Sequence, residues 1–255
     1  MAFEIEYFCT SHIGNRRSAN QDNFLCVGKF MDSDNTGTNG IISGKTVNPK
    51  PAFFGVFDGM GGEECGEIAS YIAAKTASTF EFGKKIDKDF VRYCKEANKA
   101  ICDYTSEHDI TSMGTTLASL LFRKNRIYLC NIGDSKIFRF SKNKIEQISY
   151  DHVASAAYGT KAPLTQNLGI PETELIIAPY IASGYFNGGD KYLICSDGLT
   201  DMVSLDDIAE TLRTKEGSEA AETLLQQALV GGGRDNITII LLSLKETRKK
   251  IFGIF

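Results

Sequence analysis

The stretch Val56-Phe57-Asp58-Gly59-Met60-Gly61-Gly62 begins in a short run, residues 52–57, that is almost wholly apolar. Such a run, followed directly by Asp-Gly, predicts a buried β-strand. Its first carboxylate, Asp58, then emerges where the edge of the sheet meets solvent. Asp197 and Asp235 stand in similar glycine-flanked segments later in the chain. The pattern predicts a sheet-rich fold that gathers carboxylates at the ends of its strands.

Three carboxylates at close range repel one another unless a cation lies between them. A hard divalent cation takes oxygen ligands and often keeps some of its waters. The three aspartates therefore predict a carboxylate-bound metal site that performs hydrolysis. The alternative for each aspartate alone is an ordinary turn residue, since Asp-Gly is common in turns. The order and context of all three together favour the metal site.

Composition is that of an ordinary soluble globular protein, with 255 residues, 42% hydrophobic residues, 24% charged residues and a net charge of -4. This mild acidity argues against a nucleic-acid surface. The seven cysteines never form a C-x-x-C pair, which favours buried thiols in a reducing compartment over disulfides or zinc. We see no signal peptide and no apolar stretch long enough to span a bilayer. We expect a cytoplasmic protein that binds neither membrane nor nucleic acid.

Hydrophobic periodicity divides the first half of the chain into strands and helices. Residues 31–50 are rich in Asp, Asn, Gly, Ser and Thr and predict a solvent loop or a long hairpin connection. The predicted strands are 3–7, 23–27 and 52–57, and the predicted helices are 63–80 and 88–107.

Four closely spaced strands follow, and their short connections predict an antiparallel meander. They are 115–122, 126–132, 136–140 and 144–148. The remaining predicted elements are strands near 174–181, 191–194 and 236–244 and helices 204–212 and 218–229. Helix pairs among many antiparallel strands predict an α+β fold with sheets inside and helices outside, in one domain.

Eight segments stand in this order along the chain: Arg17-Ser18-Ala19-Asn20-Gln21-Asp22, the Asp58 segment with Gly66-Glu67-Ile68-Ala69-Ser70, Met113-Gly114-Thr115-Thr116, Asn131-Ile132-Gly133-Asp134-Ser135, Asp151-His152, Leu164-Thr165-Gln166-Asn167-Leu168-Gly169, the Asp197 segment and Gly233-Arg234-Asp235-Asn236-Ile237-Thr238. In these segments and their order, from residue 14 to residue 242, the chain resembles the metal-dependent protein phosphatases, the PPM or type 2C serine/threonine phosphatases. The resemblance implies a four-layer αββα sandwich, with two mostly antiparallel sheets flanked by helix pairs. It implies a single catalytic domain over 1–255, with a short flap region at about 151–165.

The resemblance also implies two Mn²⁺ or Mg²⁺ ions and attack on phosphate by a water or hydroxide that bridges them. Asp58 is the implied bridging ligand, and the Gly59 carbonyl is a further ligand. Asp197 and Asp235 complete the first ion's shell, and Asp22 contacts metal-bound water. Glycine at 59, 61 and 62 is expected to let the backbone approach the metal.

Arg17 matches the family's phosphate-binding arginine, whose planar fork suits two phosphate oxygens. Its neighbour Arg16 is expected to be a surface charge. Gln21 stands where many members have glutamate; it can orient a water, or it is simply a solvated polar residue. Met60 replaces the histidine of eukaryotic members and cannot donate a proton, so the chain resembles bacterial members.

Many members bind a third, weaker ion. Asp109, ahead of the Gly-Thr-Thr segment, is the nearest candidate for its ligand. Asp134 is predicted to be mainly structural. The basic and then apolar residues 248–255 are expected to pack on the body of the protein, with docking to a membrane or partner as the alternative.

The predicted function is hydrolysis of phosphoserine and phosphothreonine in proteins, with a cognate Ser/Thr kinase as a further partner and a monomeric enzyme. One alternative is an inactive binding module, which would be expected to lack a metal-binding aspartate. The other is a hydrolase of small phosphate esters, which would share the same metal core. The physiological substrate is not encoded in any motif.

Overall fold

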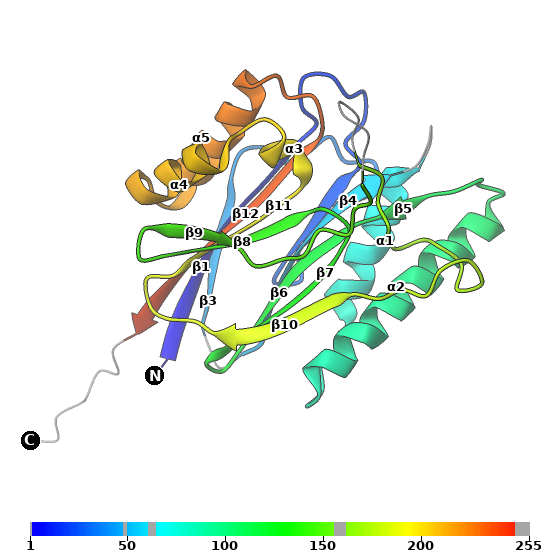
Figure 1. Cartoon of the computed structure of the whole chain (residues 1–255), viewed down its shortest axis with the longest axis horizontal. Helices are drawn as coiled ribbons and strands as arrows, with labels where there is room; N and C mark the ends of the chain where they lie inside the picture. Colours follow the sequence, from blue (N-terminus) through cyan, green and yellow to red (C-terminus); the bar gives the residue numbers. More distant parts are fainter. Residues whose placement is uncertain (1, 48–49, 61–64, 156–161, 248–255) are drawn as a thin grey trace, which may run out of the picture.

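The computed structural model describes residues 2–47, 50–60, 65–155 and 162–247. Within these residues, one antiparallel sheet, here sheet A, has the strand order β3-β1-β12-β11-β8-β9 (Figure 1). Its strands are β1 (Ala2–His12), β3 (Ile42–Val47), β8 (Lys136–Ser141), β9 (Lys144–Gln147), β11 (Lys191–Cys195) and β12 (Ile237–Thr247).

Sheet B, also antiparallel, has the order β10-β7-β6-β4-β2, and the short strand β5 pairs with the end of β4. Its strands are β2 (Asp22–Cys26), β4 (Ala52–Met60), β5 (Gly114–Thr115), β6 (Leu117–Arg123), β7 (Arg126–Ile132) and β10 (Tyr180–Tyr185).

Helices cover the outer face of each sheet and complete four layers (Figure 1). The pair α1 (Gly66–Thr79) and α2 (Ile86–Glu107) packs on sheet B. The helices α3 (Asp197–Thr200), α4 (Leu205–Thr214) and α5 (Gly217–Val230) pack on sheet A. The αββα sandwich predicted from the sequence is therefore confirmed.

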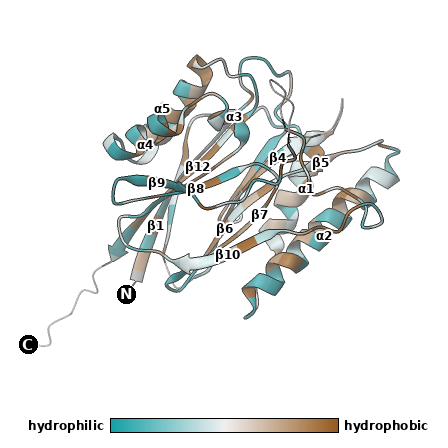
Figure 2. Ribbon diagram, in the orientation of Figure 1, coloured by the Kyte–Doolittle hydropathy of each residue, from teal (hydrophilic) through white to brown (hydrophobic). Residues whose placement is uncertain are grey.

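The central strands are apolar on both faces because each face packs against another layer. In β4, Phe54 and Val56 face the space between the sheets, whereas Phe53 and Phe57 face α1 and α2. This explains the continuous apolar run before Asp58. Figure 2 shows hydrophobic residues along the central strands and hydrophilic residues on the solvent side of α2.

The prediction for residues 31–50 was incomplete, because β3 lies inside this polar segment and pairs with β1. Its residues alternate between half-buried and exposed, as in an edge strand. Gly44 is the register partner of Tyr7, and a Cβ built there would lie 2.3 Å from the Tyr7 Oη. The glycine that made the segment look like a loop is the residue that lets β3 pack over this ring.

The predicted four-stranded meander is wrong. Strands β6 and β7 form a hairpin in sheet B, and β8 and β9 form a hairpin in sheet A. The turn Gly133-Asp134-Ser135 carries the chain from one sheet to the other, with Gly133 at φ 93°. Short connections do not always join neighbours in one sheet, and this crossing brings Asp134 to the end of the sandwich where Asp58 lies.

Other elements differ from the predictions mainly in their bounds. The strand predicted near 174–181 is β10, which begins only at Tyr180, and the one-turn helix α3 was not predicted. None of the helices in the described part of the chain is both long and apolar enough to cross a bilayer.

Candidate active site

Four aspartates line one cavity of about 320 Å³ at the end of the sandwich. Asp58 lies near the end of β4, Asp197 begins α3 directly after β11, and Asp235 lies just before β12. Asp134 comes from the turn that crosses between the sheets. The other lining residues are Arg17, Gln21, Gly59, Met60, Ala162 and Leu164. The structure therefore brings together the three aspartates, Gly59 and Arg17 that the sequence singled out.

The cavity concentrates negative charge. Burial raises the pKa of the Asp58 carboxyl well above its usual value, and the charges of Asp22, Asp197, Asp134 and Asp235 raise it further. Such a cluster of acidic oxygens suits a divalent cation, whose charge would hold the carboxylates ionised. Among the described residues, no three acidic, histidine or cysteine side chains lie together as a complete metal-ligand set, so main-chain oxygens or waters would have to supply further ligands.

The main chain of Asp58 is held by the Gly-Thr-Thr segment. Thr116 donates its N–H to the Asp58 carbonyl (2.9 Å) and accepts the Asp58 N–H at its Oγ1 (3.0 Å). The Thr115 hydroxyl donates to the same carbonyl at 3.0 Å. Thr116 Oγ1 also lies 2.7 Å from Ser135 Oγ, which ties the strand end to the turn between the sheets. Two sequence segments thus fix where the Asp58 carboxylate emerges.

Gly59 is required by packing. A Cβ at this position would lie 2.2 Å from the Gly66 carbonyl oxygen and 2.3 Å from that of Gln21, which accepts the Gly59 N–H. No larger residue fits between the start of α1 and the loop before β2. The related expectation for Gly61 and Gly62 concerns positions outside the described residues.

Arg17 lies at the rim of the cavity and donates from Nη2 to Asp235 Oδ2 at 2.7 Å. This hydrogen bond raises the pKa of the Arg17 guanidinium, and the charges of Asp58 and Asp197 act in the same direction. The side chain is about half exposed (51%), so its other donors remain accessible. The guanidinium is placed to meet an anion that enters the cavity.

Gln21, just before β2, and Asp22, the first residue of β2, differ in their access to the cavity. Gln21 lines the cavity and donates from Nε2 to Glu67 at 3.3 Å. Asp22 is buried (1% exposed) and accepts a hydrogen bond from Ser196 Oγ at 2.8 Å. Burial raises its pKa to about 7, against the lowering effect of Thr238 and Ser196. It lies behind the cavity wall, and its contact with metal-bound water stays a prediction.

Asp109 lies away from the cavity, whereas Asp134 lines it. Asp109 is an exposed residue beyond the end of α2, with φ 54°, and is not among the described residues that line the cavity. Its role at a third ion stays a prediction. Asp134, predicted to be mainly structural, is only 9% exposed and lines the cavity beside Asp58. A sequence-based hint was its place in the Gly133-Asp134-Ser135 segment, which is glycine-flanked like the other three aspartates.

Asn236 organises the site and was overlooked in the sequence, although it directly follows Asp235. Its Nδ2 donates to the carbonyls of Ile13 and Ala19, both at 2.9 Å, and its Oδ1 accepts the Gln21 N–H at 2.8 Å. One buried amide thus satisfies three main-chain groups of the loop that carries Arg17. Asparagine is suited to this because its side chain both donates and accepts.

Replacing Asn236 with alanine is expected to lower the free energy of unfolding by about 3 kcal/mol, because three hydrogen bonds are lost at roughly 1 kcal/mol each. The loosened loop should also raise KM for a phosphopeptide more than it lowers kcat. Chemical denaturation and steady-state kinetics measure the two effects. Asn125→Ala, in an exposed turn, is the control. Wild-type stability and KM in Asn236→Ala would contradict the role given to this amide.

The two ends of the region 151–165 pair with each other as a short antiparallel ladder. Val153 bridges to Leu164, the Ala154 N–H donates to the Pro163 carbonyl at 2.9 Å, and the Thr165 N–H donates to the His152 carbonyl at 2.9 Å. Residues 156–161 lie outside the described part. Ala162 and Leu164 line the cavity, so the described end of the predicted flap forms part of its wall.

Comparison with known proteins agrees with this fold. The family model for protein phosphatase 2C matches residues 44–230. The serine/threonine protein phosphatase PstP of Mycobacterium tuberculosis is 33% identical over 198 residues, which cover 72% of this chain but 38% of that protein. The serine/threonine phosphatase stp of Listeria monocytogenes is 30% identical over 220 residues, which cover 76% of this chain and 85% of that protein.

Among solved structures, the catalytic domain of PstP in complex with two manganese ions superposes with a TM-score of 0.75 and 27% identity. The match covers 96% of this chain and 100% of that one. The four-layer fold of this chain is therefore that of the PstP catalytic domain. The chain belongs to the protein phosphatase 2C family.

Proposed function

We propose that this chain is a metal-dependent serine/threonine protein phosphatase, formed as one catalytic domain over residues 1–255. The observation that carries the proposal is a single cavity that combines four aspartates with a partly exposed arginine. The names of the relatives and the two manganese ions in the PstP structure point to the same chemistry. An inactive binding module would be expected to lack a metal-binding aspartate. This alternative is disfavoured because the chain keeps Asp58, Asp197 and Asp235, and all three line the cavity.

Asp58, Asp197, Asp235 and the main chain at Gly59 are the groups that would hold two Mn²⁺ or Mg²⁺ ions. When bound, such ions lower the pKa of water and neutralise charge on a phosphoryl group. Asp22, hydrogen-bonded to Ser196, supports this cluster from behind the wall. The chain's own residues thus supply the oxygen ligands and the positions from which water can be oriented.

Arg17 would bind the phosphoryl oxygens of the substrate. Its interaction with Asp235 orients the guanidinium at the rim, where a planar fork can donate to two oxygens. Met60 lines the cavity but has no proton to give to the leaving group. The departing serine or threonine oxygen must therefore take its proton from another source.

The proposal is tested with a substrate panel in Mn²⁺ buffer. Phosphothreonine and phosphoserine peptides are expected to be hydrolysed with a kcat/KM at least tenfold above that of a small phosphate ester. Equal or greater kcat/KM for the small ester would favour the alternative hydrolase. The substrates are then phosphoproteins, and a Ser/Thr kinase that forms them is the partner that this activity implies. Buried thiols such as Cys9 and Cys195 support a reducing, cytoplasmic location.

Arg17→Ala is expected to lower kcat/KM for a phosphothreonine peptide by roughly ten- to a hundredfold. Loss of a charge-assisted, two-pronged contact costs on the order of 1.5–3 kcal/mol. The effect should appear mainly in KM, because the phosphate is already dianionic in the bound ground state. The neighbouring Arg16 is exposed and absent from the cavity wall, so Arg16→Ala is a matched control. If both variants kept wild-type kcat/KM, Arg17 would not belong to the site.

Weak discrimination among peptide sequences is a further expectation. Only residues 153–163 separate the Asp151-His152 and Leu164-Thr165 segments, so the connection is too short for an independent lid. Few contacts then reach residues that flank the phosphate, and little remote binding energy is available. Phosphothreonine peptides that differ only at flanking positions should have kcat/KM values within about tenfold, or roughly 1.4 kcal/mol. A spread of several hundredfold would show that another surface selects substrates.

A further inference from the structure

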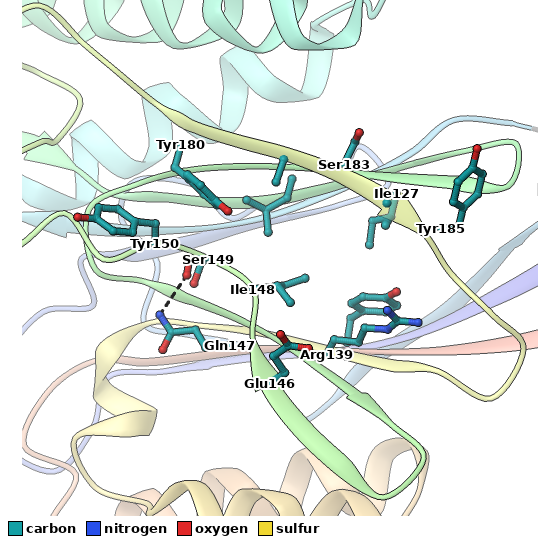
Figure 3. Close-up of a pocket in the computed structure, with 14 residues that line it drawn as sticks. Ile127, Arg139, Glu146, Gln147, Ile148, Ser149, Tyr150, Tyr180, Ser183 and Tyr185 are labelled. Atoms are coloured by element: carbon teal, nitrogen blue, oxygen red, sulfur yellow. Dashed lines mark hydrogen bonds between the residues drawn. The ribbon is translucent and has the colours of Figure 1, made fainter.

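A second cavity, of about 360 Å³, lies between the two sheets at their β9 and β10 edges (Figure 3). Residues of β7 and β10 form one wall, and residues of β8, β9 and β11 form the other. None of its lining residues is shared with the catalytic cavity, as far as the described chain shows. Its volume falls within the usual range for small-molecule sites.

This space is open because β10 carries small side chains where the sandwich needs large ones. Ala182 and Gly184 are the register partners of Leu129 and Ile127, two residues of the core between the sheets. A Cβ built at Gly184 would meet no heavy atom within 4 Å. Native interiors are otherwise filled closely, so this part of the layer has room for a group that the chain does not supply.

Two buried hydrogen-bond donors of this cavity have no partner among the described residues: the Tyr192 hydroxyl and the Arg139 Nε–H. Tyr192 is 1% exposed and is the register partner of Arg139 on the adjacent strand. Such groups are rarely left unsatisfied in native proteins. Because register partners project from the same face of a sheet, one acceptor atom can serve both donors.

Asp190 is close to both donors but is already occupied. Its carboxylate accepts hydrogen bonds from Arg139 Nη2 (2.7 Å), Ser141 Oγ (2.6 Å) and the Asn187 N–H (2.9 Å). Burial raises the pKa of Tyr192 and the adjacent Asp190 raises it further, against the lowering effect of Arg139. The Tyr192 hydroxyl nevertheless has no partner among the described residues at regular hydrogen-bond distance and angle. Tyr192 therefore stays protonated as a donor at neutral pH.

The charges around the donors select a neutral acceptor. The cation of Arg139 is paired with Asp190, and Glu146, the register partner of Arg139 on β9, also lines the cavity. Because Asp190 already neutralises Arg139, Glu146 adds a negative charge that no other described lining residue offsets, and this disfavours an anionic ligand. Figure 3 shows Arg139 and Glu146 on one side of the space and Tyr180 on the other.

We propose that this cavity is a second ligand site, which takes a neutral, mainly aromatic or alicyclic small molecule and binds its carbonyl oxygen through Tyr192 Oη and Arg139 Nε. The apolar body would lie between the sheets against Ile127, Leu129 and Ala182. The site is independent of the phosphatase activity, and its test reads binding alone.

The experiment titrates the ¹⁵N-labelled full chain with 2-phenylacetamide and, separately, with phenylacetate, which has the same shape but carries a charge. The amide is expected to give saturable shifts at residues 127–129, 146–150 and 180–185. Phenylacetate is expected to bind at least fivefold more weakly. Tyr192→Phe should weaken binding of the amide five- to tenfold, because it removes the hydroxyl alone.

Tyr185→Phe is the matched control, since its side chain lines the same cavity but is 62% exposed. Gly184→Leu should fill the space and abolish binding, while phosphatase activity and thermal unfolding confirm that the variant folds. If Gly184→Leu does not fold, Ala182→Val serves as the cavity-filling variant in its place. The proposal is overturned if the amide causes no saturable shifts at these residues, or if Tyr192→Phe and the filled variant bind it as the wild type does.

Discussion

Asp58→Asn is expected to lower kcat for a phosphothreonine peptide by three or more orders of magnitude, which corresponds to a loss of about 4 kcal/mol or more of transition-state stabilisation. The charges of four acidic residues, Asp22, Asp134, Asp197 and Asp235, act on the Asp58 carboxyl, which is also the one predicted to lie between the ions. An amide keeps the shape but supplies neither the charge nor the second anionic oxygen. Steady-state kinetics in saturating Mn²⁺ measure the effect.

The same substitution should not destabilise the protein. In chelator, Asp58→Asn removes one of several carboxylates that repel one another, so its thermal unfolding midpoint should equal or exceed that of the wild type. A lower kcat together with an equal or higher unfolding midpoint identifies a carboxylate that serves function, because loss of a structural carboxylate would lower the midpoint. Asp206→Asn, at an exposed position in the first turn of α4, is the control for both measurements. Near-normal turnover in Asp58→Asn would mean that the site has been misassigned.

Exhaustive chelation is expected to abolish hydrolysis of the same peptide, and Mn²⁺ should restore it. The physical reason is that, among the described residues, Arg17 is the one basic side chain that lines the cavity, while four acidic side chains line it. A phosphate dianion would be repelled from such a cavity unless cations entered with it. Peptide hydrolysis before chelation, after chelation and after addition of Mn²⁺ or Mg²⁺ gives the result.

Addition of an equal ionic strength of sodium chloride to the chelated protein is the control, since monovalent ions screen charge without binding the carboxylates tightly. Full activity after exhaustive chelation would refute a metal-dependent mechanism. Recovery with sodium chloride alone would show that screening, and not ion binding, was required.

Much of the architecture could be predicted because burial leaves a direct trace in the sequence. The run before Asp58 is apolar throughout since Phe54 faces one core and Phe53 the other. In β1, Glu4 and Glu6 alternate with core residues and form ion pairs with Lys45 and Lys245 on the outer face. Local periodicity of this kind is set by the layers on either side of a strand.

Features that depend on distant contacts could not be predicted in the same way. The hydrogen bond between the Thr116 and Ser135 hydroxyls helps to hold the change of sheet at Gly133, and a short glycine turn alone is equally typical of a hairpin. Strand β3 exists because β1 offers an edge to pair with, although its own composition is that of a loop. Neither partner is visible from the segment itself.

The candidate site shows the same division. Residues that can be recognised from their immediate neighbours in the sequence, such as Asp58 and Arg17, were predicted, and they line one cavity. The buried carboxylate of Asp22 is hydrogen-bonded by Ser196 and Thr238, which lie far away in the chain. Its burial was therefore not predicted. The role of Asn236 required knowledge of which main-chain groups the loop before β2 leaves unpaired.

The most direct test of the central claim is the number of Mn²⁺ ions that the chain binds tightly, measured by calorimetric titration of the chelated protein. We predict two ions for the wild type, as in the PstP catalytic domain, and loss of at least one from Asp58→Asn with Asp206→Asn unchanged. A wild-type chain that binds no Mn²⁺, or an Asp58→Asn variant that binds both ions with wild-type affinity, would contradict the account.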